Sequence, residues 1–272
     1  MTSASSDRAF AGSIPQVYDR YLVPLIFAPY AVDLARRVAA RAPERVLEIA
    51  AGTGVVTRAL ATALPASASI VATDLNQPML DHAASIGTAR PVEWRQADAM
   101  ALPFADGSFD AVVCQFGVMF FPGKAQAFRE ARRVLRPGGV FIFNVWDRIE
   151  ENEFADIVTR ALATCFTDDP PRFMARVPHG YHDLGALERD LFAAGYDRSP
   201  RATTLAERSR AQSPMEVAVA YCQGTPLRNE IEARDARRLD EATDVAAAAI
   251  AARFGANQVD GKIQAHIVTI ER

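Results

Sequence analysis

The residues best suited to chemistry stand in the run VLEIAAGTG, residues 46–54, and at Asp74, twenty residues beyond it. An apolar run that leads directly into a glycine-containing turn predicts a ligand site, because Gly52 and Gly54 have no Cβ to keep a ligand from the backbone amides. Glu48 ends the apolar run, where a carboxylate can orient a cationic amine. Asp74 ends the next one, where an acid can bind two ribose hydroxyls. The spacing therefore predicts a site for a nucleotide-like ligand.

Hydrophobic periodicity indicates the elements that must position these side chains. Between residues 45 and 145 short apolar runs alternate with amphipathic segments, which is the pattern of βαβ units and a parallel sheet. We predict strands at 45–50, 69–73, 92–96, 111–114 and 140–145. Helices are predicted at 55–63, 77–85 and 125–135. The sequence RPGG at 136–139 should stop the last of these helices and turn the chain into the next strand.

The second half of the chain has a looser pattern. It predicts helices at 151–166 and 184–194, with a loop or lid over 168–182, and strands at 201–206 and 262–270. We expect three parts: an N-terminal helical segment 1–44 that contributes to the site, a Rossmann-like core 45–212 and 256–272, and a helical insertion 213–255. The insertion lies between the last two strands, where it could cap the cofactor site.

Composition excludes several classes of function. The formal net charge is −3 and the arginines alternate with acids, which argues against a nucleic-acid surface. The cysteines Cys114, Cys165 and Cys222 are widely separated and have no CxxC spacing, so we expect buried thiols and neither a disulfide framework nor a metal site. The start of the chain lacks the pattern of a secretory signal, and no apolar run is long enough to span a membrane. We expect a cytoplasmic protein, monomeric or homodimeric.

A glycine-rich turn followed by a ribose-binding acid also fits a dinucleotide enzyme. The third glycine of GxGxxG, which allows close helix packing below a pyrophosphate, is here Thr57. No tyrosine is followed by a lysine four residues later. Both absences argue against an NAD(P)-dependent oxidoreductase, which is kept only as an alternative. A cofactor-binding protein without catalytic activity is a further alternative, since a fold alone does not establish activity.

Four motifs in order, VLEIAAGTG, VATDLN, RQADAMALPFADGSFDAV and RRVLRPGG, resemble those of class I S-adenosylmethionine-dependent methyltransferases, and among them the quinone-biosynthesis C-methyltransferases. They span residues 46–139, about a third of the chain. The resemblance implies an α/β fold with a doubly wound, Rossmann-like, seven-stranded sheet whose last strand is antiparallel. It implies S-adenosylmethionine as the cofactor and transfer of its methyl group to a small acceptor by in-line displacement, with no metal.

The resemblance also implies roles for individual residues. It places Glu48, Ala50, Gly52 and Gly54 around the methionine part of the cofactor and Asp74 on the ribose. The residues implied for the adenine and the methionyl amine are Leu75, Met79, Asp98, Ala99 and Gln115. Position 50 is usually glycine in this class, and an alanine fits there if its φ is negative. Asp74 could instead cap a helix, and Asp98 could stabilise the loop that follows it.

The acceptor pocket is predicted from aromatic and histidine side chains in segments that could converge on the carboxyl ends of the strands. The candidates are Tyr18, Tyr21, Phe120, His179 and Tyr181. Their apolar character favours a hydrophobic or aromatic small molecule. The alternatives are core packing for the aromatic residues and a surface position for the histidine. His82 and His266 are interpreted as structural, and no catalytic residue is assigned.

Overall fold

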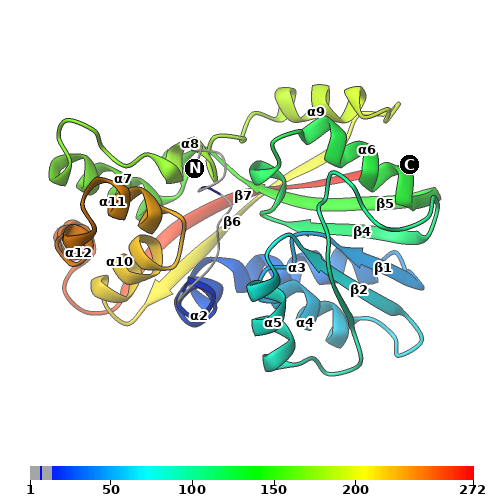
Figure 1. The fold of residues 1–272 in the computed structure, drawn as a ribbon, viewed down its shortest axis with the longest axis horizontal. Coiled ribbons are helices and arrows are strands. Elements are labelled where there is room, and N and C mark those ends of the chain that lie inside the picture. Colours follow the sequence, from blue (N-terminus) through cyan, green and yellow to red (C-terminus); the bar gives the residue numbers. More distant parts are fainter. Residues whose placement is uncertain (1–6, 8–13) are drawn as a thin grey trace. The chain divides into compact units, whose positions relative to one another are not determined.

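The computed structural model describes Asp7 and residues 14–272 (Figure 1). The expectation about the start of the chain and part of the predicted segment 1–44 fall on the remaining N-terminal residues, which lie outside the described residues. None of the helices in the described part of the chain is long and apolar enough to cross a membrane. Within the same residues no group of three or more His, Cys, Asp or Glu side chains could hold a metal ion.

The centre of the fold is a seven-stranded sheet with the order β3-β2-β1-β4-β5-β7-β6. The strands are β1 (Arg45–Glu48), β2 (Ser69–Asp74), β3 (Glu93–Gln96), β4 (Phe109–Gln115), β5 (Leu135–Trp146), β6 (Arg201–Ala211) and β7 (Val259–Glu271). The first five pair in parallel, with Val46 opposite both Ile70 and Ala111. The sequence order and the spatial order together make a doubly wound sheet, as the motifs implied.

The last strand runs antiparallel, which confirms the predicted fold class. Arg272 exchanges backbone hydrogen bonds with Gly138 and Gly139 at the start of β5, while Asp147, just after the end of β5, donates to the carbonyl of Gln264. Strand β7 therefore runs antiparallel to β5.

One turn in the predicted scheme is wrong in detail. Helix α6 (Lys124–Val134) ends where RPGG was expected to stop it, but residues 135–139 belong to β5 and not to a separate turn. Phe109 pairs with Leu135 and Ala111 pairs with Val140, so β5 carries extra residues at this point. Gly138 has a φ of +76°. The glycines thus allow an irregular strand start that still pairs with the end of β7, a choice that local turn signals cannot reveal.

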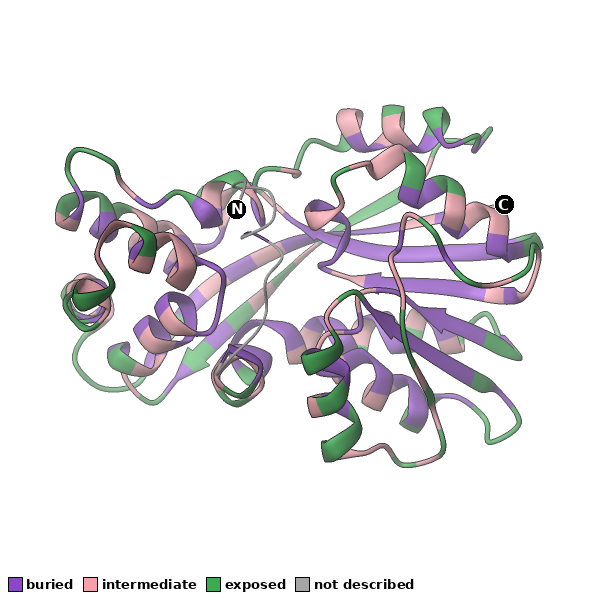
Figure 2. Ribbon diagram, in the orientation of Figure 1, coloured by how far each residue is buried: buried purple, intermediate pink, exposed green. Residues whose placement is uncertain are grey.

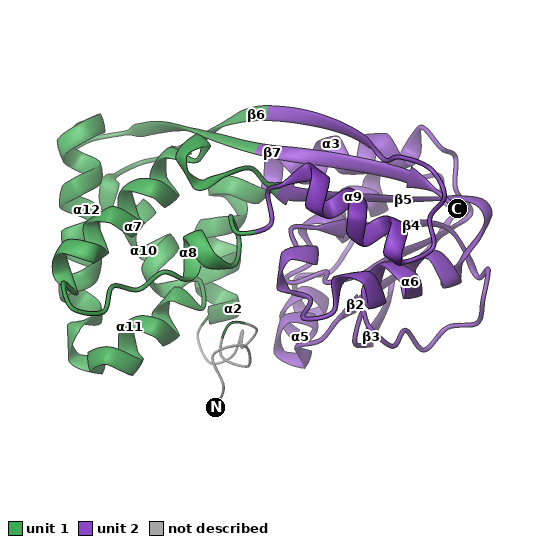
Figure 3. Cartoon of the chain, turned by 90° about the horizontal axis from the view of Figure 1, so that it is seen from above, with its two compact units in different colours: residues 1–27, 146–180, 206–264 green, residues 28–145, 181–205, 265–272 purple. Residues whose placement is uncertain are grey.

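Helices cover both faces of the sheet within one compact unit, which comprises residues 28–145, 181–205 and 265–272 (Figure 3). On one face the ring of Phe128 in α6 lies 6.0 Å from Phe141 and 5.4 Å from Phe143 of β5. Side chains alternate along a strand, so Ile142 and Asn144 face the other side. The further helices of this unit are α3 (Ala28–Ala39), α4 (Val55–Ala63), α5 (Gln77–Ile86) and α9 (Leu184–Ala193). Strands β1 and β4 are almost wholly buried between these layers (Figure 2).

The second compact unit comprises residues 1–27, 146–180 and 206–264. Its helical elements are α2 (Ile14–Val17), the π-helix η1 (Tyr18–Phe27), η3 (Ile149–Glu151), α7 (Glu153–Cys165), α8 (Phe173–Arg176), α10 (Pro214–Gln223), α11 (Leu227–Asp235), η4 (Ala236–Arg238) and α12 (Leu239–Phe254). Helix α12 packs against α10 and α7. Within residues 213–255, predicted as an insertion, the helical elements are α10, α11, η4 and α12. Cys114 and Cys222 are buried as expected, but Cys165 is only half-buried, with Sγ 3.1 Å from Arg238 Nη2.

Candidate functional site

Three predicted site residues end neighbouring strands: Glu48 ends β1, Asp74 ends β2 and Gln115 ends β4. The three strands are parallel and adjacent in the order β2-β1-β4, so these residues share one edge of the sheet. Carboxyl edges of parallel strands are where open α/β sheets bind ligands.

Glu48 is a buried carboxyl with one defined partner. It is 1% exposed, and Thr57 Oγ1 of helix α4 donates to Oε2 at 2.6 Å. Burial raises the pKa of Glu48 to about 8, against the lowering effect of that bond and of the charge on Arg58. The Glu48 carboxyl is thus held by the first turn of α4. A cation placed beside it would lower its pKa and favour the ionised form.

Asp74 organises the turn that follows β1. The amide of Gly52 donates to Oδ2 at 2.9 Å, and the amide of Asn76 donates to Oδ1 at 2.8 Å. The N-cap of α5 is Asn76, so Asp74 does not cap that helix. Burial raises the pKa of Asp74, and the amides of Asn76 and Gly52 oppose the rise. A carboxylate oxygen accepts about two hydrogen bonds, and Oδ1 already accepts a second one from Asn76 Nδ2 at 3.3 Å, so Oδ2 is the oxygen that retains capacity for a ribose hydroxyl.

The turn itself is left-handed at three positions. Ala50 has φ +55°, Gly52 +56° and Gly54 +82°. The condition set for alanine at position 50, a negative φ, is therefore not met: an L-residue occupies a conformation that favours glycine, at a cost of about 1 kcal/mol. The chain tolerates that cost because the amide of Ala51, the next residue, donates to the carbonyl of Thr73 and so ties the turn to β2.

Gly54 is required by packing as well as by conformation. A Cβ there would lie 2.9 Å from Trp94 Cη2 and 3.1 Å from Ala83 Cβ. We expect Gly54→Ala to lower the free energy of unfolding by about 2 to 4 kcal/mol, from the clash together with the left-handed φ. Gly138→Ala is the control, since Gly138 has φ +76° and nothing within 4 Å of a built Cβ, and it should cost only about 1 kcal/mol. Urea unfolding of both variants measures the difference, and equal losses would refute the packing role.

The residues implied for the adenine lie just after β2, on α5 and in the loop after β3. Leu75 is 41% exposed, unusual for a large apolar side chain, whereas Met79 of α5 is 3% exposed. Asp98 Oδ1 accepts a hydrogen bond from the amide of Met100, and Ala99 is buried. Asp98 therefore also stabilises its own loop, as the structural alternative proposed.

The loop after β4, residues 116–121, is tightly constrained and is called the β4 loop below. Phe116 follows Gln115 with φ +50°, and its amide donates to Asn144 Oδ1 of β5 at 2.8 Å. Its ring lies edge-on to Tyr30 of α3, with centroids 5.3 Å apart. Phe120 ends the short 3₁₀ helix η2 (Val118–Phe120).

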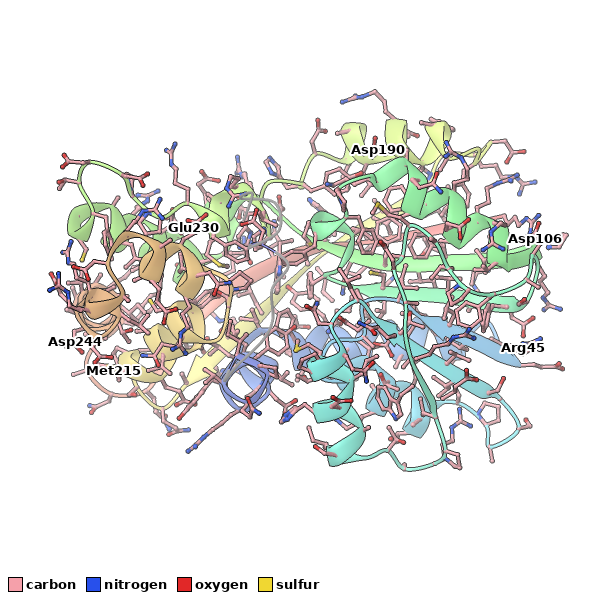
Figure 4. All side chains as sticks on the ribbon, in the orientation of Figure 1. Arg45, Asp106, Asp190, Met215, Glu230 and Asp244 are labelled. Carbon is pink, nitrogen blue, oxygen red and sulfur yellow. The ribbon has the colours of Figure 1, made fainter. Side chains whose placement is uncertain are left out.

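The five pocket candidates fall into two groups. Phe120 and Tyr181 belong to the unit that carries the cofactor residues. The hydroxyl of Tyr181 donates to Asp190 Oδ2 on α9 at 2.6 Å (Asp190 is labelled in Figure 4), and Lys124 Nζ lies 4.7 Å from the Tyr181 ring. Lys124 also donates to the carbonyl of Phe121. Tyr181 is thus anchored between α9 and the end of the β4 loop.

Tyr18, Tyr21 and His179 belong to the helical unit. Tyr18 stacks on Phe27 at 5.0 Å, Phe27 lies 6.0 Å from Trp146, and Trp146 lies 5.9 Å from His179. Tyr21 lies outside this aromatic series, with Arg20 over its ring. His179 is 4% exposed and its Nδ1 donates to the carbonyl of Asp147 at 2.8 Å, so it is not a surface histidine. The structure connects Tyr18 with His179 through aromatic contacts.

Sequence reasoning missed three polar residues. Thr57 was treated only as a missing glycine, although it holds Glu48. Thr53, between the two turn glycines, buries a hydroxyl that has no partner among the described residues. Asn144 is a buried amide and the one polar residue in the run VFIFNVW, residues 140–146. A polar residue within such an apolar run was the available signal. His266 was treated as structural, and it pairs with Thr204 Oγ1 at 2.9 Å.

Comparison with known proteins identifies the fold and the family. A methyltransferase-domain family model matches residues 47–143. YcgJ protein from Bacillus subtilis superposes with a TM-score of 0.56 at 21% identity, over 90% of this chain and 98% of that one. The demethylmenaquinone methyltransferase of Thermus thermophilus is 45% identical over 111 residues, 40% of this chain and 49% of that protein. The match thus spans about half the length of that relative.

A longer match decides the family. The ubiquinone/menaquinone biosynthesis C-methyltransferase UbiE of Pseudomonas aeruginosa is 30% identical over 171 residues, 58% of this chain and 67% of that protein. The chain belongs to the class I S-adenosylmethionine-dependent methyltransferase family. The cofactor of this family is S-adenosylmethionine. The donor set fits it: a buried carboxyl at Glu48 suits a cationic amine, Asp74 suits a ribose, and the exposed Leu75 suits an adenine face.

Proposed function

We propose that this methyltransferase-family chain transfers the methyl group of S-adenosylmethionine to a small hydrophobic or aromatic acceptor. The observation that carries the proposal is the convergence of Glu48, Asp74 and the left-handed turn on one edge of the sheet. When bound, the cofactor supplies a methyl group on a sulfonium for in-line displacement. The protein contributes position and a shielded site, because charge disappears in the transfer and tight orientation removes most of the entropic barrier.

The roles follow the chemistry of each group. Glu48 would hold the methionyl amine with Gln115 beside it, Gly52 and Gly54 would allow the ligand close to the backbone, and Asp74 would hold the ribose. Leu75 and Met79 would pack on the adenine, with Asp98 and Ala99 at its rim. Ala50 would lie beside the methionine part. These assignments are proposals that rest on residue chemistry and on the strand ends.

For the acceptor we propose a quinone-type aromatic ring, because relatives are named for demethylmenaquinone and for ubiquinone/menaquinone biosynthesis. The proposed lining from the unit that carries the cofactor residues is Phe120 and Tyr181, and Tyr18, Tyr21 and His179 stay candidates from the sequence alone. Methylation of a ring carbon requires that carbon to lose a proton, so a base must act at some stage. We further propose that residues 213–255 cap the cofactor site, and that the protein works in the cytoplasm as a monomer or homodimer without nucleic acid.

One experiment tests the proposal in two stages. Isothermal titration of the purified chain with S-adenosylhomocysteine should show one site per chain, and methyl transfer from labelled S-adenosylmethionine to a short-chain demethylmenaquinone, in its reduced form, should follow. Absence of S-adenosylhomocysteine binding, with binding of NAD instead, would overturn the proposed function. Binding without turnover on a panel of reduced quinones would overturn the acceptor class alone. Amide exchange with and without S-adenosylhomocysteine tests the cap, which requires slower exchange in α10–α12.

A further inference from the structure

Asn144 is a buried polar side chain that the proposed chemistry does not use. It lies near the carboxyl end of β5, paired in register with Gln115 of β4, and is 0% exposed. Its Oδ1 accepts the hydrogen bond from the amide of Phe116, which fixes the orientation of the side-chain amide. Its Nδ2 has no hydrogen-bond partner among the described residues. A leucine would fill such a position without that desolvation penalty, so the amide needs a reason.

The reason lies in the conformation that Asn144 holds. Phe116 has φ +50°, which is uncommon for a bulky residue and persists only where surrounding contacts impose it. The Phe116 amide donates to Asn144 Oδ1 at 2.8 Å and, over a longer distance of 3.3 Å, to the backbone carbonyl of Asn144. Tyr30 packs edge-on against the Phe116 ring and is itself tied by its hydroxyl to the carbonyl of Leu205. The side chain of Asn144 is therefore the polar anchor of the β4 loop.

The β4 loop also contacts the left-handed turn after β1, residues 50–54, which is called the cofactor turn below. Gly117 lies so close to Ala50 that a Cβ at position 117 would be 2.5 Å from Ala50 Cβ and 2.6 Å from Cys114 Sγ. Ala50 is one of the residues proposed around the methionine part of the cofactor. A shift of the β4 loop therefore displaces the turn, because the contact leaves no free space to absorb it.

We propose that Asn144 is a positioning residue of the methyltransferase site, which sets the β4 loop against the cofactor turn through Phe116 and Gly117. The inference rests on the proposed function for its effect on the cofactor, but its structural step stands independently. It predicts that loss of the Oδ1 acceptor loosens residues 116–120 and weakens cofactor binding.

The test compares Asn144→Leu with Asn144→Asp and with Asn152→Leu. Asp at pH 6 retains the acceptor oxygen, and burial keeps its carboxyl neutral. Asn152 is the matched control: it is 1% exposed and bridges the carbonyls of Asp147, Arg148 and Gln264 in the other compact unit. Asn152→Leu should lower the melting temperature without changing affinity for S-adenosylhomocysteine.

Asn144→Leu should weaken S-adenosylhomocysteine binding about tenfold and speed amide exchange at residues 116–120. Asn144→Asp should stay within about threefold of the wild type at pH 6. Wild-type affinity and wild-type exchange in Asn144→Leu would overturn the inference, and so would an Asn144→Asp variant as impaired as the leucine variant. If the wild type itself does not bind the probe, the proposed function fails, and the exchange measurement alone still decides whether Asn144 anchors the β4 loop.

Discussion

Asp74→Ala is expected to weaken the binding of S-adenosylhomocysteine by at least about a hundredfold, because it removes the carboxylate that we propose as the charge-assisted acceptor for the ribose. The same substitution leaves the amides of Gly52 and Asn76 without their acceptor, so the turn should also lose order. Titration calorimetry measures the affinity, and circular dichroism establishes that the variant remains folded. The loss of affinity should exceed what the lower stability alone explains.

Asp110→Ala separates the two effects. Asp110 also bridges two backbone amides, those of Glu44 and Arg45, both at 2.7 Å, but at the opposite edge of the sheet, where β1 begins. Its removal should lower the melting temperature in a similar way while leaving the affinity for S-adenosylhomocysteine unchanged. Equal affinity in wild type and Asp74→Ala would disprove the ribose role. A comparable loss in Asp110→Ala would show that stability, and not ligand contact, governs binding.

Much of the core fold could be predicted from the sequence because its signals are local. Helix α4 has the predicted bounds 55–63, and the first three strands fall within two residues of their predictions, since apolar runs and glycine turns mark them directly. The alternating pattern at 262–270 also predicted β7, but its antiparallel direction came from the family resemblance. The division of the long strands β6 and β7 between two compact units could not be predicted, because it depends on which helices pack together.

The details of the site were harder to predict because they depend on contacts distant in sequence. The left-handed φ of Ala50 follows from hydrogen bonds to β2 and close packing with Gly117, neither visible in the motif itself. Thr57 takes its role from reaching back across nine residues to Glu48. Asn144 pairs with an amide 28 residues away. A residue type and spacing indicate what chemistry is available, whereas the pairing of strands decides which partners meet.

Glu48 links the pH dependence of stability to that of ligand binding. Its pKa is about 8 in the folded chain against 4.5 when exposed, so the folded state holds a proton that the unfolded state has lost between these values. Below pH 4.5 both states are protonated and the contribution of Glu48 to stability is fully present. Above 4.5 the unfolded state binds fewer protons, so stability falls by about 1.4 kcal/mol per pH unit until the folded state ionises near pH 8.

Glu48→Gln should remove this decrease of stability with rising pH. Glutamine keeps an oxygen that accepts from the Thr57 hydroxyl, and it has no proton to lose. Urea unfolding of the ligand-free protein at pH 5.5, 6.5 and 7.5 should show the variant gaining on the wild type by about 1.4 kcal/mol at each step. Glu93→Gln, an exposed change on β3, should leave the wild-type slope in place. Parallel slopes for wild type and Glu48→Gln would contradict the buried, protonated carboxyl.

If Glu48 holds the methionyl amine as proposed, cofactor binding should ionise the carboxyl that is protonated in the ligand-free protein. A cation beside Glu48 favours the ionised carboxylate, so binding of S-adenosylhomocysteine near pH 7 should release close to one proton from the wild type. Titration in two buffers with different ionisation enthalpies measures that number directly. The Glu48→Gln variant should bind more weakly and release no proton from this position. Proton release that persists in the variant would assign it to another group and remove Glu48 from the amine site.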